Sequence, residues 1–132
     1  MKPRQHGFTM IELIVVIVIL GILAATALPK FIDIRSEAQQ ASVEGVAGAA
    51  ASAMNINFSG CLVKNHVVTA DKCAKVDACD DVASLLQSGV PATYAVAASG
   101  TDVGTTNGAT ATCTVTAGGK TATFTGISAG NP

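Results

Sequence analysis

The pattern of apolar and polar residues divides the chain into an apolar run, an amphipathic continuation and a mixed C-terminal half. The apolar run extends from Phe8 to Leu28, FTMIELIVVIVILGILAATAL, and its only charged residue is Glu12. As a helix with about 1.5 Å rise per residue it would be roughly 31 Å long, enough to cross the hydrocarbon core of a bilayer. We therefore predict a transmembrane helix over residues 8–28 that carries one acidic side chain.

The helical pattern continues beyond this run. Apolar or small residues recur at three- and four-residue steps, and charged or amide side chains occupy the remaining surface. The recurring positions are Phe31, Ile34, Ala38, Ala41 and Gly45. Proline lacks a backbone donor and crowds the preceding turn, so we predict a bend at Pro29, with Gly21 as a second irregularity. These features predict one helix over residues 8–58, in which residues 29–58 are amphipathic and half covered by the rest of the chain.

The C-terminal part, residues 59–132, has the pattern of a small α+β head. Ser59-Gly60-Cys61 marks a break, and an irregular polar connection follows. A short helix is expected around Val82, Leu85 and Leu86, capped by Asp77 or Asp80. Alternating Thr, Val, Ala and aromatic positions predict strands over residues 93–98, 109–116 and 120–127, with a tight hairpin at the two glycines 118–119. The predicted fold is a long N-terminal helix packed on a small antiparallel sheet of three or four strands.

All four cysteines lie in this head, at Cys61, Cys73, Cys79 and Cys113. An even number of cysteines behind a membrane-targeting segment indicates two disulfides in an oxidising compartment. The whole chain has one tyrosine, four phenylalanines and no tryptophan, too few aromatic residues for a large core, so the small head also needs covalent support. Four cysteines allow three connectivities. We favour Cys61 with Cys73, closing a short polar loop, and Cys79 with Cys113, tying a helix to a late strand.

Candidate metal, catalytic and nucleic-acid sites are weaker interpretations of the same residues. The cysteines lack the C-x-x-C spacing typical of zinc, and Asp77, Asp80 and Asp81 lack the spacing of a calcium loop. His66 has no placed acidic or nucleophilic partner, so a solvated loop residue is expected there. No phosphate-binding or hydrolase motif occurs, and the net charge of −1 provides no basic surface for nucleic acid. We therefore expect neither an enzyme nor a bound cofactor or metal.

The first seven residues, MKPRQHG, form a short basic leader that ends in Gly7. Basic residues on this flank keep the N-terminus in the cytoplasm, so the C-terminal end of the helix is expected on the far side of the membrane. A cleaved secretory signal is the alternative, since residues 24–27 contain small residues of the kind found at a cleavage site. The helical continuation beyond Leu28 argues against that alternative.

Gly7-Phe8-Thr9-Met10-Ile11-Glu12, followed by the apolar run with Gly21 and Pro29, resembles the leader and N-terminal helix of type IV pilins and pseudopilins. The resemblance covers about the first 58 residues, and residues 21–53 are most similar to pilins of the mannose-sensitive haemagglutinin type. It implies that a prepilin peptidase cuts after Gly7 and N-methylates Phe8. It also implies that Glu12 is the assembly carboxylate and that a platform in the inner membrane, driven by a cytoplasmic ATPase, extracts the subunit into a surface filament for adhesion or motility.

The physical chemistry of Glu12 supports this role. A carboxylate in lipid needs a cation, and cleavage after Gly7 creates one in the α-amino group of Phe8. Glu12 of one subunit could then pair with the Phe8 amine of a neighbour in a homopolymer. The alternative for Glu12 is that it reaches the membrane interface or is protonated in place. Two alternatives for the whole protein also remain open: a pseudopilin of a type II secretion system, and an anchored periplasmic module that does not polymerise.

Overall fold

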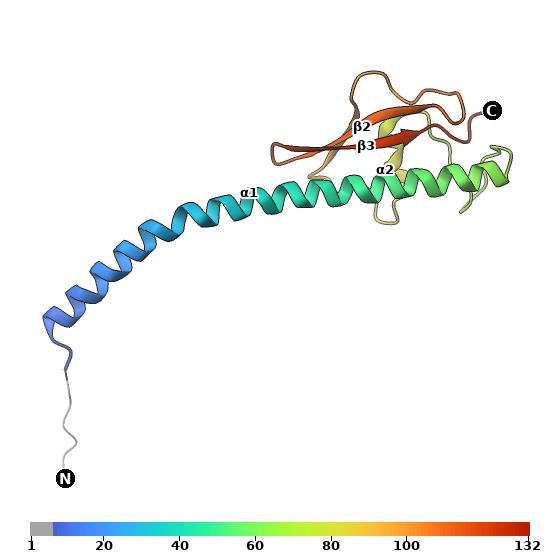
Figure 1. The fold of residues 1–132 in the computed structure, drawn as a ribbon. Coiled ribbons are helices and arrows are strands. Elements are labelled where there is room, and N and C mark those ends of the chain that lie inside the picture. Colours follow the sequence, from blue (N-terminus) through green and yellow to red (C-terminus); the bar gives the residue numbers. More distant parts are fainter. Residues whose placement is uncertain (1–6) are drawn as a thin grey trace, which may run out of the picture. The chain divides into compact units, whose positions relative to one another are not determined.

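The computed structural model describes residues 7–132, apart from the side chains of residue 29 and residues 31–33. The predicted leader, residues 1–7, therefore falls almost wholly outside the described residues. Figure 1 shows one long helix followed by short helical segments and a sheet. The elements in chain order are α1 (Met10–Val63), η1 (Cys79–Asp81), α2 (Val82–Leu85), β1 (Ala95–Ala98), β2 (Thr110–Ala117) and β3 (Lys120–Ile127). The predicted α+β class, a long N-terminal helix with a small antiparallel sheet, is confirmed.

The chain forms two compact units, Met1–Glu37 and Ala38–Pro132, and helix α1 contributes to both. In the first unit the described large apolar side chains, from Phe8 to Ile34, are all at least about half exposed. The second unit, which we call the head, has a hydrophobic core. The head is therefore the part of the chain that has an interior of its own.

The sheet of the head is antiparallel with the strand order β1-β2-β3. Strands β2 and β3 pair along their whole length, from Thr110 opposite Ile127 to Ala117 opposite Lys120. The turn between them consists of Gly118 and Gly119, both with positive φ (57° and 75°), as a two-residue hairpin of the favoured twist requires. The predicted hairpin is confirmed; β3 has the predicted bounds, and the bounds of β1 and β2 differ from the predicted ones by at most two residues.

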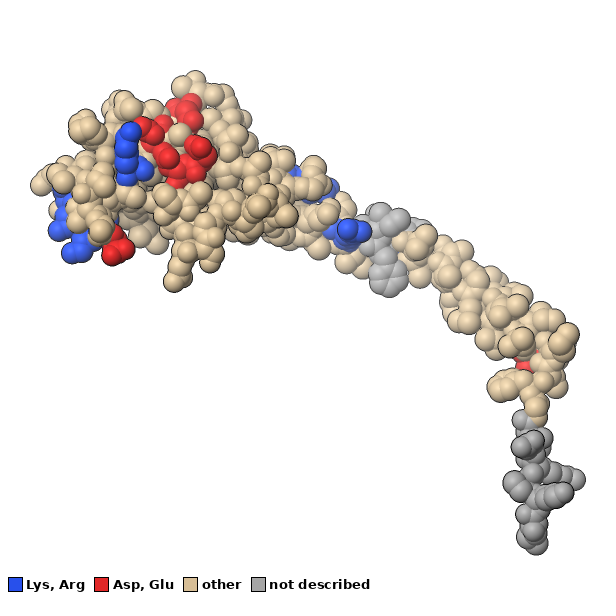
Figure 2. Space-filling model, turned by 180° about the vertical axis from the view of Figure 1, so that it is seen from behind, with Lys and Arg blue, Asp and Glu red and all other residues tan. Residues whose placement is uncertain are grey.

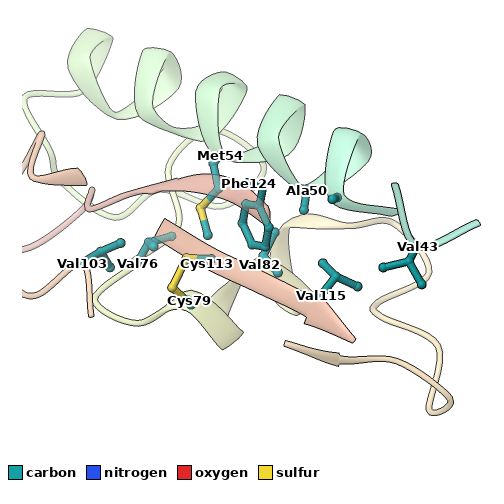
Figure 3. Close-up of a cluster of buried hydrophobic side chains, with 11 residues drawn as sticks. Val43, Ala50, Met54, Val76, Cys79, Val82, Val103, Cys113, Val115 and Phe124 are labelled. Atoms are coloured by element: carbon teal, nitrogen blue, oxygen red, sulfur yellow. A yellow bond between two sulfur atoms is a disulfide. The ribbon is translucent and has the colours of Figure 1, made fainter. Parts of the chain in front are cut away.

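The core of the head lies between this sheet and one stripe of α1. Val43, Ala47, Ala50 and Met54, spaced three or four residues apart, are buried on the helix side. Figure 3 shows Met54 and Ala50 directed toward Phe124 of β3 and the residues of β2. Burial of a Met or Val side chain contributes about 1.5–3 kcal/mol. Helix and sheet each supply one apolar face, so neither could form this core alone.

Two disulfides connect the elements of the head, Cys61–Cys73 and Cys79–Cys113. The first joins the last turns of α1 to the following loop across a separation of 12 residues. The second joins η1 to β2 across 34 residues, and both of its cysteines belong to the hydrophobic core. This is the pairing favoured from the sequence. Each bond stabilises the head by restricting the unfolded chain.

The structure corrects two local predictions. Helix α1 continues to Val63 beyond the expected break at Ser59, whose hydroxyl donates to the carbonyl of Asn55 inside the helix. Tertiary contacts override the weak helix propensity of serine and glycine here. The second correction concerns the acid before α2: Asp81, rather than Asp77 or Asp80, accepts backbone hydrogen bonds, from the N–H groups of Asp77 and Ala78.

Asn57 fixes the loop after α1 to the helix. Its side-chain amide donates to the carbonyl of Ala74 at 2.9 Å, and its carbonyl oxygen accepts from the N–H of Ala74 at 2.8 Å. The side chain therefore pairs with a backbone unit as a neighbouring strand would. Asn57 is buried, so the loss of this pair would leave Ala74 with unsatisfied polar groups.

We predict that Asn57→Ala destabilises the head by about 1–3 kcal/mol, because it leaves the partly buried N–H and C=O of Ala74 without their partner in α1. Asn55→Ala is the matched control: Asn55 is exposed, and its side-chain amide donates only to the carbonyl of Ala51 within the same helix. Denaturant unfolding of the full chain in detergent, followed by circular dichroism, measures both variants. Equal stability of the two variants would contradict the proposed role of Asn57.

A second prediction concerns glycines of α1. A Cβ at Gly60 would collide with the carbonyl group of Lys72, whose loop is held by the Cys61–Cys73 bond, so we expect Gly60→Ala to destabilise the head by about 1–3 kcal/mol. A Cβ at Gly48 meets nothing within 4 Å. Gly48→Ala should therefore stabilise the helix by about 1 kcal/mol through helix propensity. The same unfolding experiment measures both variants. Stabilisation by both substitutions would contradict the expected collision at Gly60.

Candidate assembly site at the N-terminus of α1

The candidate site is the start of helix α1 together with the apolar surface that follows it. Met10–Leu28 is long and apolar enough to cross a membrane, and none of this stretch is buried in the structure. Its large side chains project on all sides of the helix, with exposed fractions from 49% at Val15 to 81% at Met10. Figure 2 shows a single acidic group on this surface, which is Glu12. A helix that is apolar all round needs either lipid or protein around it.

Glu12 takes part in a reciprocal cap at the start of α1. Its Oε2 atom accepts hydrogen bonds from the backbone N–H of Thr9 at 2.8 Å and from the hydroxyl of Thr9 at 2.7 Å. The N–H of Glu12 in turn donates to Thr9 Oγ1 at 3.3 Å. This T-x-x-E arrangement satisfies backbone donors that have no partner within the helix. The carboxylate is thereby held at the positive end of the helix dipole.

The cap uses one oxygen of the carboxylate. Both bonds from Thr9 reach Oε2, and no described residue donates a hydrogen bond to Oε1. An ionised carboxylate can accept about four hydrogen bonds, so Glu12 keeps acceptor capacity while it caps its own helix. The arrangement can therefore both start the helix and receive a cation from another molecule.

The other predicted site residues lie at separate positions along the chain. Gly7 and Phe8 precede the helix, and the side chain of Phe8 is 88% exposed. A Cβ added at Gly21, within the helix, would meet no atom within 4 Å, and α1 continues through residue 29. The side chain of Pro29 lies outside the described ones, so the bend at these two positions stays a prediction. The cysteines are absent from this site, since all four form the disulfides of the head.

The acidic, histidine and cysteine side chains do not gather into a metal site. Within residues 7–132, no group of three or more His, Cys, Asp or Glu side chains is placed to hold a metal ion. His66 instead accepts a long hydrogen bond from the N–H of Gly130, at 3.4 Å, and its ring lies 5.8 Å from that of Phe58. The hydrogen bond holds the loop after α1 against the C-terminal segment, and the ring contact holds it against α1. His66 therefore has a structural position in this loop.

Thr9 is the residue that the sequence reasoning missed. The signal was present, because a threonine followed three residues later by a glutamate and then by an apolar run is typical of a helix N-terminus. The role expected of Glu12 was a contact with another subunit, and the local bond to Thr9 was not foreseen. In the structure the local bond fixes where the carboxylate is presented.

Comparisons with known proteins bear on both the site and the whole chain. Residues 2–28 match the family model described as the prokaryotic N-terminal methylation motif. The chain is 35% identical over 124 residues to the type IV narrow pilus major component PilA5 of Thermus thermophilus, covering 92% of this chain and 95% of that protein. It is 49% identical over 51 residues to the type IV major alpha-pilin of Moraxella bovis, covering 39% of this chain and 32% of that protein.

A further relative, the type IV major pilin protein PilA of Myxococcus xanthus, is 46% identical over 43 residues, which cover 33% of this chain and 20% of that protein. No solved structure matches the chain. The matches to Moraxella and Myxococcus proteins are short, whereas the similarity to PilA5 extends over the helix and the head together. With the exposed apolar helix, the N-terminal methylation motif and the disulfide-linked head, this similarity establishes that the chain belongs to the type IV pilin family.

Proposed function

We propose that this chain is the structural subunit of a type IV pilus and polymerises through helix α1 into a surface filament for adhesion or motility. The observation that carries the proposal is the apolar stretch Met10–Leu28, which no described residue covers and which holds one acid at its capped end. Relatives named as major pilins support the same role. A structural subunit needs no catalytic group, metal or cofactor.

The proposed sequence of events begins in the inner membrane. Residues 8–28 span the bilayer once, residues 1–7 form the leader, and the helix continuation and head lie on the periplasmic side. A prepilin peptidase cuts between Gly7 and Phe8 and methylates the Phe8 amine. An assembly platform in the inner membrane then extracts the subunit, and the finished filament is extracellular. The bends predicted at Gly21 and Pro29 would let the helix adjust between the two environments.

The same apolar surface would serve in lipid and in the filament. Each Å² of apolar area removed from water is worth about 25 cal/mol, so a helix of this length that leaves the membrane must be covered again by other helices. Glu12 would set the axial position of each subunit relative to its neighbour in the filament. Its free Oε1 can accept the charged Phe8 amine of a neighbouring subunit, so that two charges are neutralised away from water. The acid is positioned for this contact by Thr9 of its own helix.

The disulfides support a pilus over a periplasmic pseudopilus. The Cys61–Cys73 and Cys79–Cys113 bonds hold the loop after α1 and the sheet in place. A head exposed outside the cell under mechanical load benefits from such covalent links more than one confined to the envelope. The assignment to the mannose-sensitive haemagglutinin subtype stays a prediction from residues 21–53.

The first test separates the charge of Glu12 from its capping role. Glu12→Gln keeps a side-chain oxygen that can accept from Thr9 but removes the charge, whereas Glu12→Ala removes both. We expect both variants to be inserted and processed, with at least about a tenfold loss of filaments in material sheared from cells, because an intramembrane carboxylate is retained for a charged partner. Glu37→Gln, which removes an exposed charge further along α1, is the control and should assemble normally. Normal filaments from Glu12→Gln would refute the charge pairing.

The second test concerns processing. Intact mass and N-terminal sequencing of sheared surface material should show a chain that starts at N-methylated Phe8 and whose four cysteines are all oxidised. Gly7→Leu should block cleavage and leave the leader attached, because the peptidase requires a small residue there on the resemblance to other pilins. A wild-type chain that still begins at Met1 in surface material would contradict the proposed processing.

A further inference from the structure

One region of the head exposes large apolar side chains. Among the described residues of the head, the large hydrophobic residues that are more than half exposed all lie between residues 56 and 68. They are Ile56, Leu62, Val63, Val67 and Val68. We call them the Ile56–Val68 patch. Val63 is 79% exposed and Ile56 73%. A concentration of this kind on a water-soluble surface is typical of a protein interface.

The patch borders a groove of about 690 Å³ between α1, the disulfide loop and α2. Ile56 and Val68 line the groove together with Ala53 of the helix and Leu85 of α2. The small side chain of Ala53 would allow another chain to approach the helix closely. Two members of the patch, Ile56 and Val68, thus belong to the groove as well, near the C-terminal end of α1.

Two lysines border this surface. Lys64 follows α1 directly, and its N–H donates to the carbonyl of Cys61. Lys72 lines the groove beside Asp71, and its backbone lies against Gly60. Two positive charges and one negative charge therefore surround the apolar side chains. A surface of this composition fits a partner that combines apolar contact with negative charge.

The head itself carries such a negative surface. Figure 2 shows acidic side chains gathered in one group on the head, separate from the lysines at its end. The group forms around Cys79: Asp77 and Asp81 are joined through a backbone hydrogen bond, and Asp102 accepts from the N–H of Cys79 at 2.7 Å. Asp80 follows Cys79 directly and is exposed. We call Asp77, Asp80, Asp81 and Asp102 the acidic face.

Only part of the acidic face is neutralised within the chain. Lys75 forms an ion pair with Asp77, and the hydrogen bond between them lowers the pKa of Asp77 and raises that of Lys75. Asp81 and Asp102 cap backbone N–H groups. Among the described residues, no side chain donates a hydrogen bond to the carboxylate of Asp80. The face thus keeps a net negative charge that is free to meet a basic surface.

We propose that the Ile56–Val68 patch docks on the head of a second copy of this chain at the edge of its acidic face, with Lys64 and Lys72 opposite Asp80 and Asp102. The proposal rests on the proposed function and names the contact between the heads of neighbouring subunits in the filament. Identical subunits in a helical filament meet through two different surfaces, one on each neighbour. An apolar surface bordered by lysines and a separate acidic surface on the same head are such a pair. Anionic lipid would attract the patch but repel the acidic face beside α2.

The first arm of the test adds a charge to the patch. Val67 is 63% exposed, so Val67→Glu should leave the head folded with both disulfides, which mass and circular dichroism verify. We expect at least about a tenfold loss of filaments in sheared surface material, because a charge on the buried side of an interface is strongly unfavourable. Thr123→Glu, which adds the same charge to an exposed position of β3, is the matched control and should assemble normally.

The second arm exchanges charges. Asp80→Lys and Lys72→Asp should each reduce filament yield several-fold, and the double variant should restore it toward the wild-type level, because opposite charges again face each other. Both side chains are exposed, so loss of folding is not expected. Normal assembly of Val67→Glu, or a double variant that is no better than the single ones, overturns the inference.

The outcomes separate this inference from the proposed function. Wild-type filaments that contain the chain support the proposed function whatever the patch variants do, and their absence contradicts it. Vesicles of phosphatidylcholine with phosphatidylglycerol test the remaining occupant of the patch. Because Met10–Leu28 inserts into any bilayer, the full chain is reconstituted in every sample and the readout is hydrogen-exchange protection of residues 56–68. Protection by these vesicles, but not by phosphatidylcholine alone, that Val67→Glu abolishes, together with normal filaments, would assign the patch to a membrane surface and overturn the contact between copies.

Discussion

The exposure of the apolar stretch Met10–Leu28, which no described residue of the chain covers, is the constraint on which the rest of the molecule depends. A helix that is apolar on every side cannot remain in water as an isolated element. It must lie first in lipid and then against other helices, and the remainder of the chain is arranged around that need. The capped carboxylate of Glu12 is the one charged group on this apolar surface. Thr9 holds its Oε2 atom and leaves Oε1 free.

In the head, the same helix forms part of a hydrophobic core. Its sheet has three strands and too few large side chains to form a core alone, so a stripe of α1 supplies the second apolar face. Because this stripe is made of Val43, Ala47, Ala50 and Met54, helix and sheet can approach closely. The disulfides and the two hydrogen bonds between Asn57 and Ala74 then fix the loop that returns from the helix. The helix is thus a membrane anchor at one end and part of a folded core at the other.

The sheet packs on one side of α1 within the head. The C-terminal end of the helix and the loop that follows it keep exposed apolar side chains. The Ile56–Val68 patch is the consequence, and such a concentration of exposed apolar side chains is typical of an interaction surface. A subunit that polymerises has a physical reason to leave such a surface open. The separation between the acidic face and the lysines of the patch gives the head two unlike surfaces, as a heterologous contact requires.

Much of this could be predicted from local sequence because the signals are strong over short distances. The apolar run, the glycines of the hairpin, and the alternation along 120–127 determine the helix, the turn and β3. The end of α1 at Val63 could not be predicted, because the loop backbone that lies against Gly60 is brought there only by folding. The capping role of Asp81 is local, to N–H groups three and four residues before it, but the neighbouring aspartates at 77 and 80 offered the same signal. The capping role of Thr9 is indicated by its spacing to Glu12, although the sequence analysis did not predict it.

The sequence by itself determined that one helix is apolar enough for a membrane, that it carries a single acid near its start, and that a cysteine-containing α+β head follows. Hydrophobic periodicity and turn chemistry are local properties, so they can be read along the chain. The tertiary structure alone decided which face of α1 the sheet covers, how Asn57 holds the returning loop, and where apolar side chains and the acidic face remain exposed. Those features arise from contacts between residues distant in sequence, whose geometry exists only once helix, loop and sheet have packed together.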